Sequence, residues 1–360
     1  EREHRRRHVP AARTPEGLMP PAALTLPVPD DYVLARDVCS YGYFLLAPNL
    51  WSPHERRFIT TLNTSRAAVT LTISQPPRHT RSAKPRSAGP ITSARELLST
   101  RGRPLHILPD RPLPPRDERL VRDQLTRMLN LTTTTRDLRE FHRLDPRFKP
   151  LGRGRLFRSP SFFEDVIKTV TSCNVTWPGT ISMNTRLCAT LGRRSPTRRH
   201  AFPTPQALAA VAPARLRATC RVGYRDARLV DLATRFADGR VDVEWFENPS
   251  TPDADLRAAL LDLPGVGPYA AHNILQLLGR YDHLPLDTES VRHARNVLSF
   301  KGTSRSLMKR IDAHFAPFAP HRFRSYWFEL WNFYEARRGH SWTWDPATTG
   351  TTFTAAQLKP

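Results

Sequence analysis

The sequence predicts an α+β protein in which an N-terminal antiparallel β-sheet domain precedes an all-α domain. Three observations support this fold class. Short runs of β-branched and aromatic residues, separated by Asn, Pro and Ser, dominate residues 23–75. Helical spacing of apolar residues dominates from about residue 117 onward. The length of 360 residues is sufficient for two or three domains, and strands followed by a run of helices are typical of α+β proteins.

Basic residues far outnumber acidic ones. Lys and Arg total 55 against 33 Asp and Glu, which gives a formal net charge of +22 at pH 7. This excess predicts a polyanionic partner, because Lys and Arg neutralise phosphates and release condensed counterions. We expect no membrane partner, since no apolar run is long enough to span a bilayer. No apolar segment follows the arginines at 5–7, as a secretory signal would require.

Composition divides the chain into four segments. Residues 1–22 are basic and Pro-rich, and we expect a disordered arm there. Residues 23–130 are predicted to form the sheet domain, with a basic, Pro-rich insertion at 76–116. Residues 131–340 are predicted to form the helical domain, and residues 341–360 a C-terminal tail.

Individual elements follow from local patterns. Apolar runs predict strands at 32–34, 43–46, 67–73 and 105–108. The predicted helices are 117–130, 162–170, 204–219, 224–237, 252–262, 268–279, 288–299, 304–316 and 321–338. The second of these helices has a Ser at 161 that can cap its first turn.

The four cysteines, Cys39, Cys173, Cys188 and Cys220, lie far apart in the sequence. Their spacing matches neither a zinc site nor an iron–sulfur cluster. We therefore expect reduced, packed thiols and no metal site.

The most informative segment is 261–271, with the sequence LDLPGVGPYAA. Two amphipathic segments flank a tight turn in which we expect Gly265 and Gly267 to adopt positive φ and to allow close backbone approach. The second segment begins at Pro268, so the N–H groups of its first turn point outward, where a phosphate can bind. An ordinary αα-corner is the structural alternative.

Twenty residues beyond Gly267 follows the sequence LPLDTES, which contains Asp287. Here the chain resembles the helix-hairpin-helix (HhH-GPD) superfamily of DNA glycosylases, with LPGVGPYAA as its hairpin and Asp287 as its aspartate. Further likenesses are LFRSP at 156–160, TSCN at 171–174 and GYR at 223–225. The resemblance covers about 150–340. The preceding region resembles, more weakly, the N-terminal domain of the 8-oxoguanine and 3-methyladenine branches.

The resemblance implies that Asp287 is catalytic. Cleavage of an N-glycosidic bond builds positive charge on the deoxyribose, and a carboxylate beside C1′ stabilises that charge and orients the attacking water. Asp287 can also serve as a helix N-cap, and both roles can hold at once.

Position 269 bears on the type of reaction. Family members that also cut the strand carry a Lys there, which attacks C1′. This chain has Tyr269, and no Lys lies between 169 and 300. A hydrolytic, monofunctional enzyme is therefore expected, with Tyr269 in the base pocket. A core Tyr on a helix face is the alternative.

The resemblance also implies contacts to DNA. Asn174 matches a residue that fills the gap left by a flipped nucleotide, although a helix-terminating Asn explains it almost as well. Gly265, Val266 and Gly267 of the hairpin, and Arg292 beyond it, are the expected backbone contacts. A further basic cluster is either solvated or follows phosphates: Arg193, Arg194, Arg198, Arg199 and His200.

The last predicted helix is dense in aromatic residues, and those at 327, 331 and 334 share one face. Core packing is the default interpretation of such a stripe. In the family the corresponding helix contributes to the base pocket, where aromatic rings stack on a flipped base. Phe328 and Trp331 are the preferred pocket residues.

Together these features predict a monofunctional DNA glycosylase that flips a damaged base, an alkylated or deaminated purine, and hydrolyses its glycosidic bond. The alternatives are an 8-oxoguanine or mismatch-pyrimidine glycosylase, or a non-catalytic helix-hairpin-helix DNA-binding protein. The expected partner is double-stranded DNA containing a damaged base. No redox cofactor or iron–sulfur cluster is expected, although the family holds a monovalent cation at the hairpin carbonyls. We expect an intracellular monomer, in a nucleus or in a bacterial nucleoid or cytoplasm.

Overall fold

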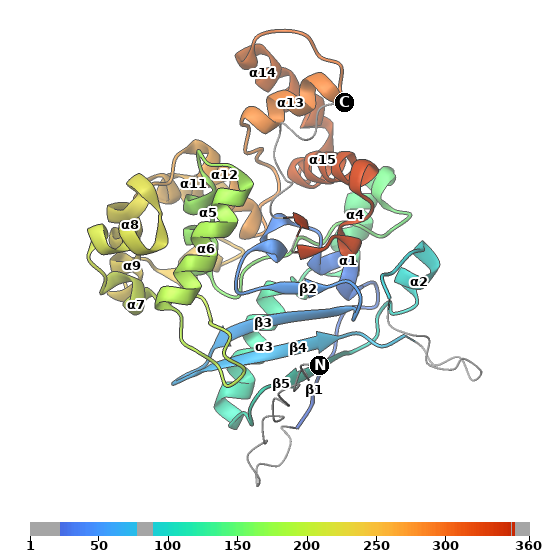
Figure 1. Ribbon diagram of the computed structural model, residues 1–360. Helices are drawn as coiled ribbons and strands as arrows, with labels where there is room; N and C mark the ends of the chain where they lie inside the picture. The colour runs from blue at the N-terminus through green and yellow to red at the C-terminus, as the bar shows by residue number, and fades with distance from the viewer. Residues whose placement is uncertain (1–21, 78–88, 347, 350–360) are drawn as a thin grey trace, which may run out of the picture.

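The centre of the protein is a five-stranded antiparallel sheet with the order β1-β5-β4-β3-β2 (Figure 1). The structure is a computed structural model that describes residues 22–77, 89–346 and 348–349, so nearly all of the predicted arm 1–22 lies outside the described residues. The strands are β1 (Leu24–Leu26), β2 (Leu50–Ser52), β3 (Arg57–Asn63), β4 (Ala68–Ser74) and β5 (Leu105–Pro109).

Helices make up most of the remaining chain, which confirms the predicted α+β class. In the first half they are α1 (Leu34–Val38), α2 (Ala94–Leu98), α3 (Pro115–Met128), α4 (Thr135–Leu144), α5 (Phe162–Ser172), α6 (Trp177–Leu191) and α7 (Pro205–Ala209). They continue as α8 (Pro213–Cys220), α9 (Asp226–Ala237), α10 (Val243–Glu247), α11 (Asp253–Leu261), α12 (Pro268–Leu277), α13 (Thr288–Asn296), α14 (Ser304–Phe315) and α15 (Arg322–Arg338).

Two of the predicted strands are confirmed. The run at 67–73 is β4, which pairs with β3 along seven residues. The run at 105–108 is β5, which pairs with both β1 and β4 and is therefore an inner strand of the sheet. This part of the segment 76–116 belongs to the sheet itself and is not an insertion into it.

The strands predicted at 32–34 and 43–46 are wrong. Helix α1 begins at Leu34, and a 3-10 turn, η1, spans Gly42–Leu45. Both runs are buried, and Asp37 accepts a hydrogen bond from Val33 N at 2.9 Å, which replaces a strand partner. Short apolar runs that are buried on all sides show no periodicity that separates strand from helix.

The helix predicted at 204–219 is divided into α7 and α8. Pro213 is the first residue of α8. Proline has no N–H for the helix ladder and is well placed only in a first turn, so the backbone restarts there. The other predicted helices are present with ends that differ by a few residues.

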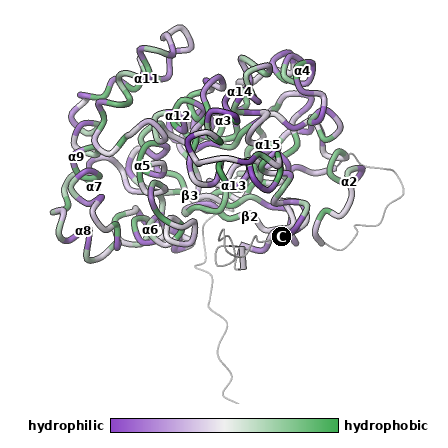
Figure 2. Tube along the Cα trace, turned by 90° about the horizontal axis from the view of Figure 1, so that it is seen from above, coloured by the Kyte–Doolittle hydropathy of each residue, from purple (hydrophilic) through white to green (hydrophobic). Residues whose placement is uncertain are grey.

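The buried side chains form two hydrophobic cores. One joins the sheet to α3 and to the C-terminal helices α13, α14 and α15. The other is formed by α5–α9, α11 and α12. Figure 2 shows α5–α9 on one side of the molecule and α2 and α4 on the other, with α13 and α15 between them. The core therefore does not follow the predicted boundary at residue 130, because C-terminal helices pack on the N-terminal sheet.

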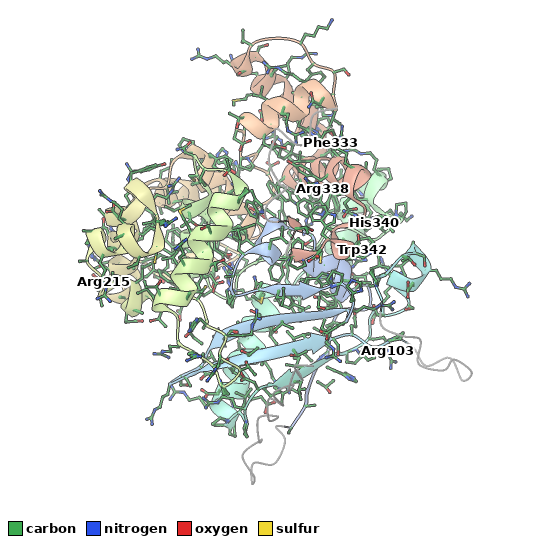
Figure 3. The ribbon with its side chains drawn as sticks, viewed as in Figure 1. Arg103, Arg215, Phe333, Arg338, His340 and Trp342 are labelled. Atoms are coloured by element: carbon green, nitrogen blue, oxygen red, sulfur yellow. The ribbon has the colours of Figure 1, made fainter. Side chains whose placement is uncertain are left out.

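The first residues of the predicted tail also belong to the core. Trp342 and Trp344 are buried, and Trp51 Nε1 of β2 donates to the Trp342 carbonyl at 2.8 Å. His340 stacks on Trp342 with ring centroids 4.3 Å apart, directly after α15 (Figure 3). These contacts attach the chain beyond α15 to the sheet.

All four cysteines are free thiols; Cys173 is partly buried and the other three are buried. The described residues contain no group of three or more His, Cys, Asp or Glu side chains able to hold a metal ion. Within the same residues no helix is both long and apolar enough to cross a bilayer.

Tyr281, in the loop after α12, is buried between two arginines. The Arg324 guanidinium lies 3.9 Å from the Tyr281 ring centroid, and Asn130 and Arg158 donate to the phenol oxygen at 3.4 and 3.5 Å. Burial alone would raise the pKa of Tyr281, but the two guanidinium groups and the Asn130 hydrogen bond lower it to about 8. A tyrosinate can therefore form beside Arg324 in mildly alkaline solution.

Tyr281→Phe should cost more stability at alkaline pH than at neutral pH. A Tyr with a pKa of about 8 in the folded state and about 10 in the unfolded state stabilises the fold increasingly as pH rises from 7 to 10. The difference in melting temperature between wild type and variant, measured across that range, should widen. The exposed Tyr224→Phe is the control, and a gap for Tyr281→Phe that stayed constant with pH would contradict the assignment.

Candidate active site

A cavity of about 380 Å³ lies where α6, α12, α13 and α15 approach one another. This volume is within the range of small-ligand sites in proteins. The wall residues come from widely separated parts of the chain: Tyr41, Gly42, Tyr43, Leu45, Ser172, Val175, Thr176, Trp177, Tyr269, Asn273, Pro285, Asp287, Thr288, Glu289, Tyr326, Trp327, Leu330, Trp331 and Tyr334.

Asp287 is the N-cap of α13, and its two carboxylate oxygens have different surroundings. Oδ1 accepts hydrogen bonds from the backbone N–H groups of Glu289 and Ser290 at 2.9 and 3.0 Å, and lies 3.3 Å from the Ser290 hydroxyl. Ser290 Oγ accepts in return from Asp287 N at 3.1 Å, which completes a capping box. Oδ2 has no hydrogen-bond partner among the described residues. The cap thus fixes the carboxylate and leaves one oxygen available in the cavity wall.

Burial raises the pKa of Asp287 above its ordinary value. The nearby Glu289 carboxylate acts in the same direction, while the capping hydrogen bonds from Ser290 and Glu289 lower the pKa and only partly compensate. The charged form is therefore less stable than in water. A charge in such a weakly screened place interacts strongly with an opposite charge that forms beside it.

The cavity walls are flat aromatic rings. The Trp327 ring lies 4.8 Å from the Tyr41 ring and 5.2 Å from the Trp331 ring, between centroids, and the two indoles are inclined by 28°. Trp327 Nε1 donates to the Ser40 carbonyl at 2.8 Å. Trp177 packs against Gly42, where a Cβ would lie 2.9 Å from the indole. These contacts fix the rings in place around the space.

Three of the predicted chemical residues share this cavity: Asp287, Tyr269 and Trp331. The prediction that Phe328 lines it is wrong. Phe328 is 1% exposed and packs on Phe148, with ring centroids 5.6 Å apart, in the core beside the sheet. Phe328 points about 100° around the helix axis from Trp327, and its ring packs in the core instead of lining the cavity.

Trp327 was missed as a wall residue, although the spacing of 327, 331 and 334 placed it on the face that meets the cavity. Tyr41 and Trp177 were also missed. No local signal marks them, because they reach the cavity from a 3-10 turn and from the first turn of α6, far from Asp287 in the sequence.

Tyr269 lies in the first turn of α12 and is largely buried. Burial and the charge of Asp287 raise its pKa above the ordinary value, so the phenol is neutral near pH 7. No Lys lines the cavity within the described part of the chain. Lys168, on the nearby α5, is buried in an ion pair with Glu164, with Nζ and Oε1 2.6 Å apart.

The turn between α11 and α12 presents backbone groups to the outside. Gly265 has a φ of +83°, as predicted, and a Cβ there would lie 3.3 Å from Arg228 Cδ. The positive φ expected at Gly267 is wrong. Gly267 is the N-cap of α12 with a φ of −99°, and no atom lies within 4 Å of where its Cβ would be. The N–H groups of both glycines have no partner among the described residues.

Val266 anchors this turn instead of facing outward. Its side chain is buried, and its N–H donates to the Leu263 carbonyl at 3.1 Å. Of the three predicted hairpin contacts, the two glycines therefore offer free N–H groups, and Val266 has only its carbonyl left to offer a ligand.

Asn174 is near the cavity in sequence, between the wall residues Ser172 and Val175, but does not itself line the cavity. It is exposed and has a φ of +50°, and α5 ends before it, because the C-cap Cys173 is already extended. Its amide Nδ2 is 3.4 Å from the hydroxyl of Tyr224, which is 53% exposed. Arg225 ties the two segments together by donating to the carbonyls of Cys173 and Asn174.

Arg292 does not stand free for a DNA contact. It forms an ion pair with Glu289, donates to the Tyr334 hydroxyl at 3.0 Å, and lies 4.9 Å from the Phe333 ring centroid. The side chain holds α13 against α15, and its charge is compensated. The basic cluster near residue 195 is bound to the sheet end, where Thr197 Oγ1 donates to Asp110 at 2.7 Å.

No protein-family model matches the sequence, and no curated protein matches it. Solved structures share the fold. The 3-methyladenine DNA glycosylase of Archaeoglobus fulgidus superposes with a TM-score of 0.59 at 16% identity, covering 87% of this chain and 99% of that chain.

The 8-oxoguanine glycosylase/lyase of Clostridium acetobutylicum superposes in its apo form with a TM-score of 0.55 at 15% identity, covering 81% of this chain and 93% of that chain. Its complex with double-stranded DNA gives a TM-score of 0.54, with 83% and 93% covered. The chain therefore has the fold of the helix-hairpin-helix DNA glycosylases, as its motifs predicted.

Proposed function

We propose that the protein is a monofunctional DNA glycosylase, which hydrolyses the N-glycosidic bond of a damaged base flipped out of duplex DNA. The observation that carries this proposal is the carboxylate of Asp287. Its Oδ1 is held by the start of α13, while Oδ2 remains without a partner in the wall of an aromatic cavity. A protein that only grips DNA has no use for a partly buried carboxylate with a raised pKa in such a cavity.

The carboxylate would act on the sugar. As the base departs, positive charge develops on the deoxyribose, and Asp287 in its ionised form stabilises that charge and orients the water that attacks C1′. The capping hydrogen bonds hold the carboxylate in place, so it need not reorient during the reaction. The weakly screened surroundings increase its effect on the transition state.

The aromatic walls favour a flat, electron-poor base. Trp327, Trp331 and Tyr41 offer ring faces on which a flipped base can stack. An alkylated or deaminated purine fits this description, and 8-oxoguanine is the runner-up. Single-turnover assays on duplexes that each carry one lesion distinguish these substrates, because with enzyme in excess a matched base is released much faster than the others.

The hairpin would hold the DNA backbone. The free N–H groups of Gly265 and Gly267 and the start of α12 can bind a phosphate, and this contact carries no sequence information. A monovalent cation between the hairpin carbonyls and that phosphate is part of the proposal.

Asp287→Asn should retain the fold and lose base release. Asn caps a helix as well as Asp and can accept the same two N–H bonds, so the melting temperature should not fall. The single-turnover rate should drop about 100-fold or more, because the negative charge beside C1′ is gone. Wild-type activity should also decrease on acidification at a pH above the usual pKa of an aspartate, since burial raises the pKa of Asp287.

Ser290→Ala is the matched control for the cap. It removes one member of the capping box and keeps the carboxylate, so stability should decrease by about 1 kcal/mol while the enzyme stays active. Near-wild-type base release by Asp287→Asn would exclude Asp287 from the mechanism.

The product should be an intact strand with an abasic site. Strand scission in this family proceeds through an imine, which requires an amine near C1′, and the described cavity wall has the Tyr269 phenol instead. Borohydride should trap no protein–DNA adduct, and strand cleavage should appear only after alkali. Efficient trapping by the wild-type protein would refute the monofunctional assignment.

The two hairpin glycines should respond differently to Ala. Gly267→Ala meets no atom and needs no unusual φ, so the fold should persist while its methyl group blocks approach of a phosphate. Binding to damaged and undamaged duplexes should weaken equally in a fluorescence-anisotropy titration.

Gly265→Ala must adopt a left-handed φ and should lower the free energy of unfolding by roughly 1 to 2 kcal/mol. If Gly267→Ala bound undamaged duplex normally, the hairpin would be structural only.

A further inference from the structure

Two more hollows continue from the cavity along α13 and α14. The first, of about 360 Å³, lies between α13 and the start of α14, and its walls include Thr288, Arg295, Asn296 and Ser304. The second, of about 470 Å³, lies at the loop between the two helices and includes Arg295 and Lys301. Thr288 is a wall residue of the cavity of Asp287 and of the first hollow, and Arg295 is a wall residue of both hollows. We name the two hollows together the α13–α14 groove.

The α13–α14 groove is strongly basic. Residues 288–315 contain six Lys or Arg and two acidic residues, Glu289 and Asp312. Both acids are already in ion pairs, with Arg292 and Arg322 respectively.

Four of the other cations in this segment are open to a ligand. Arg295 and Lys301 are exposed, and neither forms an ion pair with another described residue. Arg305 and Lys309, one turn apart on the outer surface of α14, are exposed in the same way. Figure 1 shows α13 and α14 projecting from the body of the molecule, so that a large ligand can reach this face.

We propose that the α13–α14 groove binds the phosphate backbone of the duplex on one side of the damaged nucleotide, as a second grip besides the hairpin. This inference rests on the proposed function, because it uses the position of the flipped nucleotide in the cavity. The two backbone contacts are carried by helices that form different walls of the cavity, because α12 contributes Tyr269 to the wall and α13 contributes Thr288. The side chains of Arg295 and Lys301 supply the charge that phosphates require.

The dimensions of α13 set the reach of this contact. Its nine residues span about 13 Å at the rise of an α-helix. Duplex DNA advances 3.4 Å per base pair, so Arg295 and Lys301 meet phosphates about four base pairs from the lesion. A duplex that ends closer than this on the relevant side cannot use the groove.

The test combines a charge-removal variant with duplexes of unequal arms. Arg295→Gln/Lys301→Gln removes two groove cations, and Arg116→Gln/Arg119→Gln removes two exposed cations from α3, at the opposite end of the molecule (Figure 1). Each protein is titrated by anisotropy against lesion duplexes in which one arm, 5′ or 3′, is shortened from ten base pairs to two. Thermal melting verifies that both variants are folded.

For the wild type, affinity should fall about tenfold when one particular arm is cut below about four base pairs, and should depend little on the other arm. The groove variant should bind the long-armed duplex about tenfold more weakly and show no further loss on shortening. Its slope of log affinity against log salt should decrease by about 2, one unit for each lost phosphate contact. The α3 variant should behave as wild type.

Three results would overturn the groove. They are equal weakening by both variants, undiminished affinity of the groove variant, and a dependence on arm length that survives in the groove variant. The proposed function is tested separately, by base release from the same duplexes. If the wild-type protein released no base but showed the arm-length dependence, the proposed glycosylase activity would be refuted and the proposed DNA contact of the groove would stand.

Discussion

The geometry of the site depends on which of the two carboxylate oxygens of Asp287 accepts hydrogen bonds. Asp287 accepts the N–H groups that begin α13 with Oδ1 alone, which leaves Oδ2 without a partner in an aromatic cavity. The positive end of the helix helps to hold a negative charge that burial disfavours, and the raised pKa shows that burial prevails. The same hydrogen bonds that start the helix therefore also fix the position of the carboxylate that we propose to be catalytic.

The aromatic walls of the cavity belong mainly to the core that joins the sheet to the C-terminal helices, which includes Tyr41, Tyr326 and Trp331. Helix α15 contributes both to the core and to the cavity wall. Phe328 packs into the core with Phe148, while Trp327 and Trp331 line the cavity. Trp327 is fixed by its bond to the Ser40 carbonyl, which belongs to the N-terminal half. A wall built from both ends of the chain requires that the C-terminal helices pack on the sheet, and this explains why the sheet and the last helices share one core.

The helix starts around the cavity are used in different ways. At α13 the orphan N–H groups are capped by Asp287, whereas at α12 the N-cap is Gly267, which has no side chain to cap them. A glycine N-cap leaves the first N–H groups of the helix for water or a ligand to satisfy. The N–H groups of the hairpin thus remain free for an anion, whereas in the proposed function the partly buried Asp287 carboxylate would stabilise positive charge on the sugar. In the proposed function the start of α12 would bind the phosphate of a nucleotide, and Asp287 at the start of α13 would lie beside its sugar.

The sequence by itself determined the hairpin, the capped helix that begins at Asp287, the absence of Lys at position 269 and the face formed by 327, 331 and 334, because each depends on residues within a few turns of one another. Only the tertiary structure decided which side of α15 lines the cavity and that Tyr41 and Trp177 complete the cavity walls. It also decided that Arg292 is held in an ion pair with Glu289. Finally, it decided that the run at 32–34 leads into α1 and that the run at 43–46 lies mostly in a 3-10 turn. Local sequence patterns specify caps, turns and helix faces. A run that is buried on all sides has no hydrophobic periodicity to show whether it is strand or helix. Contacts between distant segments cannot be read from the local sequence of either segment.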